Sequence, residues 1–159
     1  MTIHYDGNDF HGWQVQAKGR TVQGDIEDAL SAIYPDEKIT LIGAGRTDAG
    51  VHALGQAAHI KLPSKLSADE LQQALNGNLN QDVRIDKVDE VGDDFHTRFS
   101  ATAREYEYRL VKHFSPVTRN YTTPLKWEIH NKLLNECVEL LPGKHDFTSF
   151  CKATAEVEN

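Results

Sequence analysis

The spacing of hydrophobic and polar positions predicts a strand and then a helix at the start of the chain. Ile3 and Tyr5 alternate with polar neighbours and stop at an Asp-Gly-Asn sequence, which is typical of a short strand that ends in a turn. From Val22 the apolar residues recur at helical spacing as far as Ile33, and Pro35 closes this segment. We therefore expect a helix of about three turns here.

The pattern continues with two strands, a helix and a fourth strand. Alternating apolar residues predict strands over 38–44 and 56–62. A second helix begins at Ser67, because this serine and Glu70 form the sequence of a capping box for the first turn. A less regular alternation over 83–91 predicts the fourth strand.

The resulting order is strand, helix, strand, strand, helix, strand, which is the split βαβ or ferredoxin-like arrangement of an α/β domain. In this arrangement an antiparallel sheet carries two helices on one face and leaves the other face free to bind. We assign this domain to residues 1–100. The loop 43–50 joins the two middle strands, so we expect it at one end of the sheet, above the open face.

The segment after residue 100 has a pattern of its own. Thr102–Lys112 alternates, with Tyr106 and Tyr108 on one side, and predicts a long strand. From Asn131 to Leu141 the apolar residues recur at helical spacing, and a Pro-Gly pair ends the predicted helix. We interpret 101–159 as the beginning of a second domain that the chain does not complete.

The composition argues against several classes of protein. With 159 residues, of which 39% are hydrophobic, the chain can bury a core. No stretch reaches the roughly 20 apolar residues that cross a bilayer, and the N-terminus has no signal sequence, so we expect a cytoplasmic protein. Cys137 and Cys151 lack the spacing of a zinc site and are expected to be reduced thiols. The eight histidines are scattered singly, and we expect no metal site.

The formal charge of −7 argues against a protein that coats nucleic acid, because binding to phosphates normally depends on Lys and Arg. This charge does not exclude a local basic patch on the surface. The positive residues near the conspicuous loops are mainly arginines, which suit bidentate phosphate contacts. They are Arg20, Arg46, Arg98, Arg104 and Arg109.

The loop 43–50 carries the clearest candidate for chemistry. Asp48 lies two residues after Arg46, among three glycines that leave the backbone free and unshielded, so a substrate can approach the carboxylate. One alternative is an ordinary turn aspartate that bonds to its own backbone. Another is a phosphate-binding loop, although the dinucleotide fingerprint needs a glycine at position 48 and a helix after the loop. A serine hydrolase is excluded by the absence of GxSxG.

Two further segments suit contact with nucleotides. Phe95, His96, Thr97, Arg98 and Phe99 combine rings with a guanidinium, and bases stack on rings while arginine contacts the backbone. The alternative is that both phenylalanines anchor a linker in the core. Tyr106 and Tyr108 lie at strand spacing and could also contact nucleotides. The alternative is that they are half-buried packing residues, which is the more common role of tyrosines in strands.

An ordered set of motifs resembles the tRNA pseudouridine synthase A family. The motifs run from the first residues to the last. They are Tyr5–Gly7, Phe10–Gln16, Thr21–Gly24, Gly45–Ala53, Phe95–Ala101, Arg104–Tyr108 and Asp146–Phe150. The resemblance implies the pseudouridine synthase fold, with a second domain similar to the first. It also implies isomerisation of uridine to pseudouridine in the anticodon stem-loop of tRNA, without cofactor or metal.

The resemblance also implies roles for individual residues. Asp48 corresponds to the catalytic aspartate, which attacks the uracil ring or the ribose. Arg46 corresponds to a residue that steadies the flipped nucleotide, and Tyr106 to one that packs on the uracil and assists removal of its C5 proton. The segment 95–99 corresponds to a tRNA contact, and so does 154–158, where the match is weakest.

Family members continue beyond the position of Asn159 and act as homodimers. By this resemblance the chain is the N-terminal portion of such an enzyme, and we expect the isolated portion to be inactive. A non-catalytic RNA-binding module is the alternative from another class. A nucleotide-binding domain that uses the glycine loop is the third interpretation.

Overall fold

A computed structural model describes residues 1–63 and 66–150 of the chain. The chain forms two compact units, of which the first runs from Met1 to Tyr106 and the second begins at Glu107. The predicted contact at 154–158 and the predicted thiol at Cys151 lie outside the described residues.

The first unit is a mixed α/β structure with a four-stranded antiparallel sheet. Its elements are β1 (Thr2–Tyr5), α1 (Val22–Ile33), β2 (Ile42–Gly43), β3 (Ala53–His59), α2 (Ala68–Asn78) and β4 (Val83–Lys87). The strands follow the order β2-β3-β1-β4, and each neighbouring pair is antiparallel. The predicted order of strands and helices is therefore confirmed.

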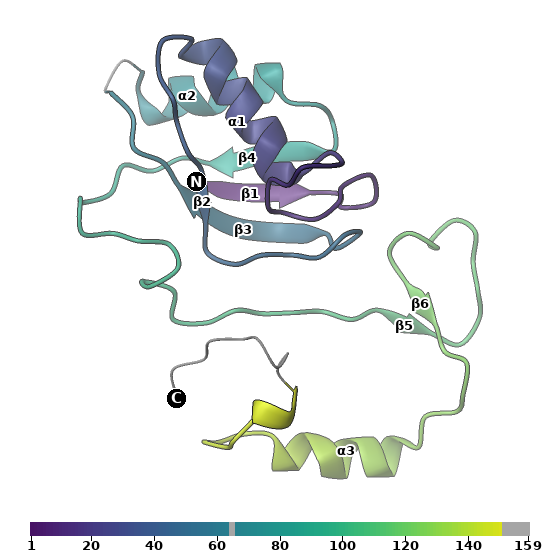
Figure 1. The fold of residues 1–159 in the computed structure, drawn as a ribbon. Helices are drawn as coiled ribbons and strands as arrows, with labels where there is room; N and C mark the ends of the chain where they lie inside the picture. The colour runs from purple at the N-terminus through teal and green to yellow at the C-terminus, as the bar shows by residue number, and fades with distance from the viewer. Residues whose placement is uncertain (64–65, 151–159) are drawn as a thin grey trace. The chain divides into compact units, whose positions relative to one another are not determined.

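Helices α1 and α2 lie on the same side of this sheet (Figure 1). Between them and the sheet lies one hydrophobic core. Its largest fully buried side chains are Tyr5, Ile3, Ile26, Leu30, Leu41, Leu75, Ile85 and Val22. The opposite face is polar along β1 and β4, where His4 and Arg84 are exposed.

Side chains cap the start of both helices. The hydroxyl of Thr21 accepts a hydrogen bond from the backbone N–H of Gly24, at 3.2 Å. At α2 the predicted capping box is present, because Ser67 and Glu70 bond to each other's backbone N–H groups. These bonds satisfy N–H groups that a helix otherwise leaves without a partner in its first turn.

Two predicted strands are shorter than expected. Of the strand predicted over 38–44, only Ile42–Gly43 is observed. The backbone of Leu41 bonds to side chains of α1 instead of a neighbouring strand. Its N–H donates to Glu27 Oε1 at 2.9 Å, and its carbonyl accepts a hydrogen bond from Gln23 Nε2 at 3.2 Å. For 83–91 the strand ends at Lys87, which pairs with Thr2 at the start of β1. A strand ends where its neighbour ends, and the alternation along one segment does not contain this information.

The strand predicted over 56–62 is shifted to Ala53–His59 and contains an irregularity. Ile3 of β1 pairs with Gln56, whereas Tyr5 pairs with Ala53, so β3 has one extra residue between these pairs. A bulge of this kind reverses which side chains face the core. Leu54 is accordingly 69% exposed.

The second unit has little regular structure among its described residues. Strands β5 (Leu110–Val111) and β6 (Thr123–Pro124) form a parallel pair. They are followed by α3 (Asn131–Leu140) and the short 3₁₀ helix η1 (Thr148–Phe150). The predicted helix over 131–141 is confirmed. No helix in the described parts of the chain is long and apolar enough to cross a membrane.

The long strand predicted over 102–112 is wrong. Only Leu110–Val111 forms a strand, and the residues from 102 to 109 are assigned to no strand. Its neighbour β6 is two residues long, and its hydrogen bonds reach only Arg109 O and Val111 O. Alternating side chains favour an extended backbone, but a strand also needs a partner along its whole length.

Candidate active-site loop

The loop from Ala44 to His52 connects β2 to β3 in the first unit, as predicted for the loop 43–50. Its first residues are held at the sheet. The N–H of Ala44 donates to Ala57 O at 2.8 Å, and the side-chain amide of Gln56 donates to Gly45 O at 2.6 Å. Arg104 donates from Nη2 to Ala44 O at 2.8 Å. The loop therefore starts from a fixed position.

Its central residues rest on the segment between β1 and α1. The N–H of Trp13 donates to Thr47 O at 3.0 Å, and the hydroxyls of Tyr5 and Thr47 lie 2.8 Å apart in a hydrogen bond. On the other side of Asp48, the N–H of Gly50 donates to Phe10 O at 3.3 Å. Both flanks of Asp48 are thus bonded to the same segment.

Two glycines allow this close approach. A Cβ atom on Gly12 would lie 2.5 Å from Thr47 O, and the φ angle of Gly12 is +91°, a conformation that other residues rarely adopt. A Cβ on Gly7 would lie 2.0 Å from Val51 O. Any side chain at either position would displace the loop. The sequence analysis included both glycines in motifs but did not identify their contact with the loop.

The side chain of Asp48 is exposed, and so is that of Arg46. Within the described residues neither side chain forms a hydrogen bond or an ion pair. Asp146 is different, because its carboxylate accepts the N–H of Thr148 at 2.9 Å, as a turn aspartate does. The turn interpretation therefore does not describe Asp48. Its backbone is fixed while its carboxylate stays accessible.

The phosphate-loop interpretation is wrong for this segment. A dinucleotide fingerprint places a helix directly after the glycines, where the helix N-terminus binds the phosphate. Here the loop leads into β3. No helix N-terminus follows the loop.

The segment 95–99 is attached to the sheet through one residue. Thr97 is 3% exposed, and its hydroxyl bonds to Ile42 O at 3.1 Å and to His59 Nδ1 at 2.8 Å. Burial, together with the nearby charge of His96, lowers the pKa of His59, which keeps this imidazole neutral. The structure thus gives Thr97 an anchoring position rather than an exposed one.

The neighbours of Thr97 lie outside the core. Phe95 is 38% exposed and its ring meets that of His59 edge-on, while Phe99 is 78% exposed. The ring of His96 contacts the rings of both His59 and Phe99, with centroid distances of 4.8 Å and 4.4 Å. The guanidinium of Arg98 is 5.9 Å from the centroid of Phe99. The alternative that both phenylalanines anchor the core is therefore wrong.

Tyr106 and Tyr108 are 66% and 84% exposed. The alternative of half-buried packing therefore does not describe them. Within the described residues, no hydrogen bond or ring contact joins Tyr106 to the loop that carries Asp48. Arg104, two residues earlier, is the member of this motif that contacts the loop.

The five arginines differ in their partners. Arg20 forms ion pairs with Asp25 and Asp82, and Asp82 contributes most to the rise in its pKa. Arg109 pairs with Glu107 at 2.6 Å. Among the described residues, Arg46, Arg98 and Arg104 have no carboxylate partner. Arg104 bonds to a backbone carbonyl of the loop, whereas Arg46 and Arg98 remain available for phosphate.

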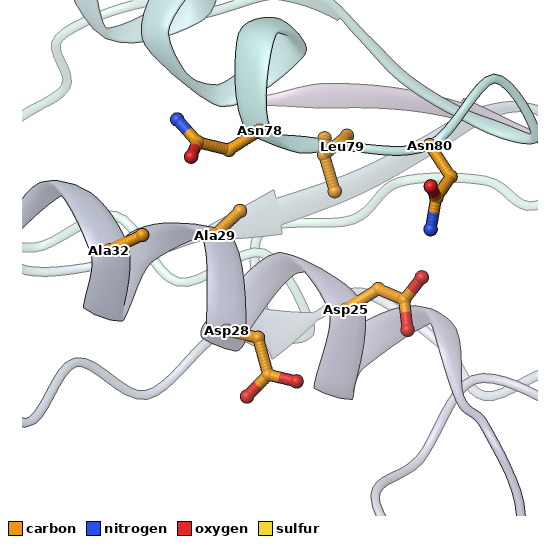
Figure 2. A pocket seen from close by; sticks show the side chains of 7 residues that line it. All are labelled: Asp25, Asp28, Ala29, Ala32, Asn78, Leu79 and Asn80. Atoms are coloured by element: carbon orange, nitrogen blue, oxygen red, sulfur yellow. The ribbon is translucent and has the colours of Figure 1, made fainter.

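A pocket of about 230 Å³ lies elsewhere in the first unit, between α1 and the residues that follow α2 (Figure 2). It is lined by Asp25, Asp28, Ala29, Ala32, Asn78, Leu79 and Asn80. Asp25 already pairs with Arg20. The described residues contain no group of three or more side chains that could hold a metal ion. The accessible carboxylate at position 48 is therefore the candidate site, not this pocket.

The geometry defines an α/β protein with one exposed aspartate on a firmly held loop of an antiparallel sheet. A family model described as tRNA pseudouridine synthase matches residues 1–100. The chain is 46% identical over 162 residues to tRNA pseudouridine synthase A of Brachyspira hyodysenteriae, covering 98% of this chain and 64% of that protein. The chain is 42% identical over 159 residues to tRNA pseudouridine synthase A of Geobacillus kaustophilus, covering 99% of this chain and 62% of that protein.

A third relative, tRNA pseudouridine synthase A of Bacillus pumilus, is 40% identical over 161 residues, covering 99% of this chain and 65% of that protein. The chain belongs to the tRNA pseudouridine synthase family, and the resemblance found in the sequence is confirmed. It spans 62–65% of the length of these three relatives.

Proposed function

We propose that the chain is part of an isomerase that converts uridine to pseudouridine in the anticodon stem-loop of tRNA. The observation that carries this proposal is Asp48, whose backbone is fixed on both sides while its carboxylate faces solvent. The names of the relatives support tRNA as the substrate. The strand order β2-β3-β1-β4 supports a ferredoxin-like first domain, and 101–159 begins a second one.

The proposed reaction exchanges one bond for another. The carboxylate of Asp48 attacks the uracil ring or the anomeric carbon of the ribose, and the bond between that carbon and N1 breaks. The base then joins the ribose through C5, C5 loses its proton, N1 gains one, and Asp48 is released. A carboxylate suits this role because it forms a covalent intermediate and leaves again. No oxidant or cofactor is consumed.

The target uridine must leave the stem before it can react. Unstacking a base costs a few kcal/mol, which contacts to the flipped nucleotide offset. Arg46 contacts this nucleotide, Tyr106 packs on its ring, and the segment 95–99 binds the surrounding RNA. The exposure of Arg46, Arg98 and Phe99 supports these roles. Tyr106 is 66% exposed, so its ring is accessible to a base.

The enzyme acts in the cytoplasm as a homodimer in this proposal, and residues beyond those present here complete the cleft. The experiment uses an extended chain, in which the part of the Brachyspira hyodysenteriae relative that this chain does not match is fused to Asn159. Both chains are incubated with tRNA that carries tritium at uracil C5, at equal concentration and low salt.

We expect tritium release by the extended chain. Release by the 159-residue chain should be slower by a factor of about a hundred or more, because a single missing charge in an active site costs about this much. Binding of tRNA by the extended chain without tritium release would instead support the RNA-binding module. Comparable rates for both chains would show that the residues present here already form the complete site.

A further inference from the structure

The hydroxyl of Tyr5 lies in the core directly below the candidate loop. Tyr5 is 2% exposed, ends β1, and packs its ring at a centroid distance of 6.1 Å from that of Trp13. Phenylalanine would fill this volume equally well, so packing alone does not explain a hydroxyl here. Burial raises the pKa of Tyr5, and the phenol keeps its proton.

Among the described residues, this hydroxyl forms a hydrogen bond with Thr47 Oγ1, at 2.8 Å. Thr47 directly precedes Asp48 in the chain. Its carbonyl accepts the N–H of Trp13 and lies against Gly12. The hydrogen bond to Tyr5 is therefore the side-chain connection between the core and the residue next to the aspartate.

Orientation at Asp48 must come through the backbone. Its carboxylate has no hydrogen-bond partner of its own in the part of the chain that the structure describes. Val51 N–H donates to Asp48 O at 3.2 Å, and this turn is held by the bond from Gly50 to Phe10. Thr47 lies at the other end of the turn, directly before Asp48. Rotation about the backbone at this point would change the direction of the Asp48 carboxylate.

We propose that Tyr5 is a positioning residue, whose hydroxyl bond to Thr47 Oγ1 holds Asp48 in the orientation from which it attacks. This inference rests on the proposed function of Asp48. A reacting group displaced by about 1 Å loses roughly a hundredfold in rate. The loss falls on kcat, because Tyr5 is buried and does not touch the RNA.

The first test measures tritium release by the extended chain and its variants Tyr5→Phe, Thr47→Val, Thr47→Ser and the double variant Tyr5→Phe/Thr47→Val. We expect each loss of a hydroxyl to lower kcat by about ten- to a hundredfold, with KM for tRNA changed less than about twofold. Thr47→Ser keeps the hydroxyl and should restore most of the rate. The double variant should be no slower than either single one, because both remove the same bond.

The second test measures backbone amide exchange in the 159-residue chain and does not depend on activity. We expect Tyr5→Phe to speed exchange at Gly50 and Val51, whose N–H groups hold the turn. The matched control is Tyr34→Phe, which removes a hydroxyl from another buried tyrosine, at the C-cap of α1. This control should leave exchange in the loop unchanged.

Unchanged kcat in an active Tyr5→Phe protein would overturn the inference, and so would unchanged exchange at Gly50 and Val51. Additive losses in the double variant would also overturn it. Absence of tritium release from the unsubstituted extended chain would refute the proposed function itself. The exchange experiment then still decides whether Tyr5 holds the loop.

Discussion

Helices α1 and α3 have the same kind of apolar spacing but different surroundings. Helix α1 buries Val22, Ile26, Ala29 and Leu30, whereas no residue of α3 is buried. Leu133, Leu134 and Val138 of α3 are 48–58% exposed. Helical spacing is enough to predict a helix in both units. Burial also needs a surface that packs on the apolar side of the helix. Helix α1 has this in the core of the first unit, whereas the described part of the second unit contains only the two-stranded pair β5-β6 and the short η1 in addition to α3.

The two units also differ at the helix ends. Both helices of the first unit have a side chain that caps the first turn, while His130 at the start of α3 makes no such bond. Each cap contributes about 1 kcal/mol. The first unit therefore combines capped helices with tertiary packing, whereas α3 has neither a side-chain cap bond nor a buried residue.

The largest effect expected is on activity, and it lies in the first unit. Asp48→Asn in the extended chain should abolish tritium release, because the change removes the proposed nucleophile. Affinity for tRNA should stay within a few-fold, since the variant loses no positive charge. Asp146→Asn is the matched control, as this carboxylate bonds within its own turn in the second unit. Turnover by Asp48→Asn above the uncatalysed rate would refute the assignment.

The next effect separates the two units by stability. Leu30→Ala should lower the free energy of unfolding by about 2–5 kcal/mol, because it leaves a cavity in the core. Leu134→Ala in α3 should change it by less than about 0.5 kcal/mol, as expected for an exposed position. Urea unfolding followed by far-UV circular dichroism, to which the helices of both units contribute, measures both changes. Equal losses would show that α3 is buried in solution.

A smaller effect concerns the caps. Ser67→Ala should lower stability by about 1 kcal/mol, because it removes the acceptor for the N–H of Glu70. His130→Ala is the matched change in the second unit and should have no such effect, since His130 forms no cap bond. Amide exchange in the first turns of α2 and α3 distinguishes the two. Faster exchange in both helices would mean that His130 also acts as a cap.

The smallest effect is a dependence on pH. The folded protein holds the pKa of His59 below its ordinary value, so the unfolded chain binds a proton more readily. The stability that depends on partly buried, neutral His59 is therefore fully present above the ordinary pKa of about 6.5, and it is lost as the pH falls from that value through the lower pKa of the folded state. Urea midpoints on either side of this pH measure the change.

Two variants test this assignment. His59→Gln should show a weaker dependence on pH than the unsubstituted chain, whereas His113→Gln, at an exposed position in the second unit, should behave like it. If His59→Gln keeps the full dependence, another group is responsible.

The local signals in the sequence were sufficient for most elements of the first unit. The helix Val22–Ile33 and the capping box at Ser67 depend on residues within one or two turns, and both are confirmed. The ends of β2 and β4 depend on Glu27 and Thr2, far away in the sequence. For the same reason the strand predicted over 102–112 is wrong: its pattern contains no information about a partner.

For the candidate site, too, the sequence predicted the local feature but not the long-range contacts. The sequence singled out Asp48 and its loop from the glycines around it. It did not reveal that Tyr5, Gly12 and Trp13 hold this loop, since these are tertiary contacts. The glycines at 7 and 12, between a strand and a helix, were the signal that another segment approaches there.

The contacts that hold the loop also have a consequence for the order of folding. The bond between Tyr5 and Thr47 closes a separation of 42 residues, and that between Gly7 and His52 closes one of 45. Such closures carry an entropic cost that is recovered only once the enclosed segments have paired. We therefore expect the loop to take its final shape late, after α1 has docked and β1 has met β3. Partly folded chains would then carry Asp48 without its geometry, so that reactivity and the completed fold arise together.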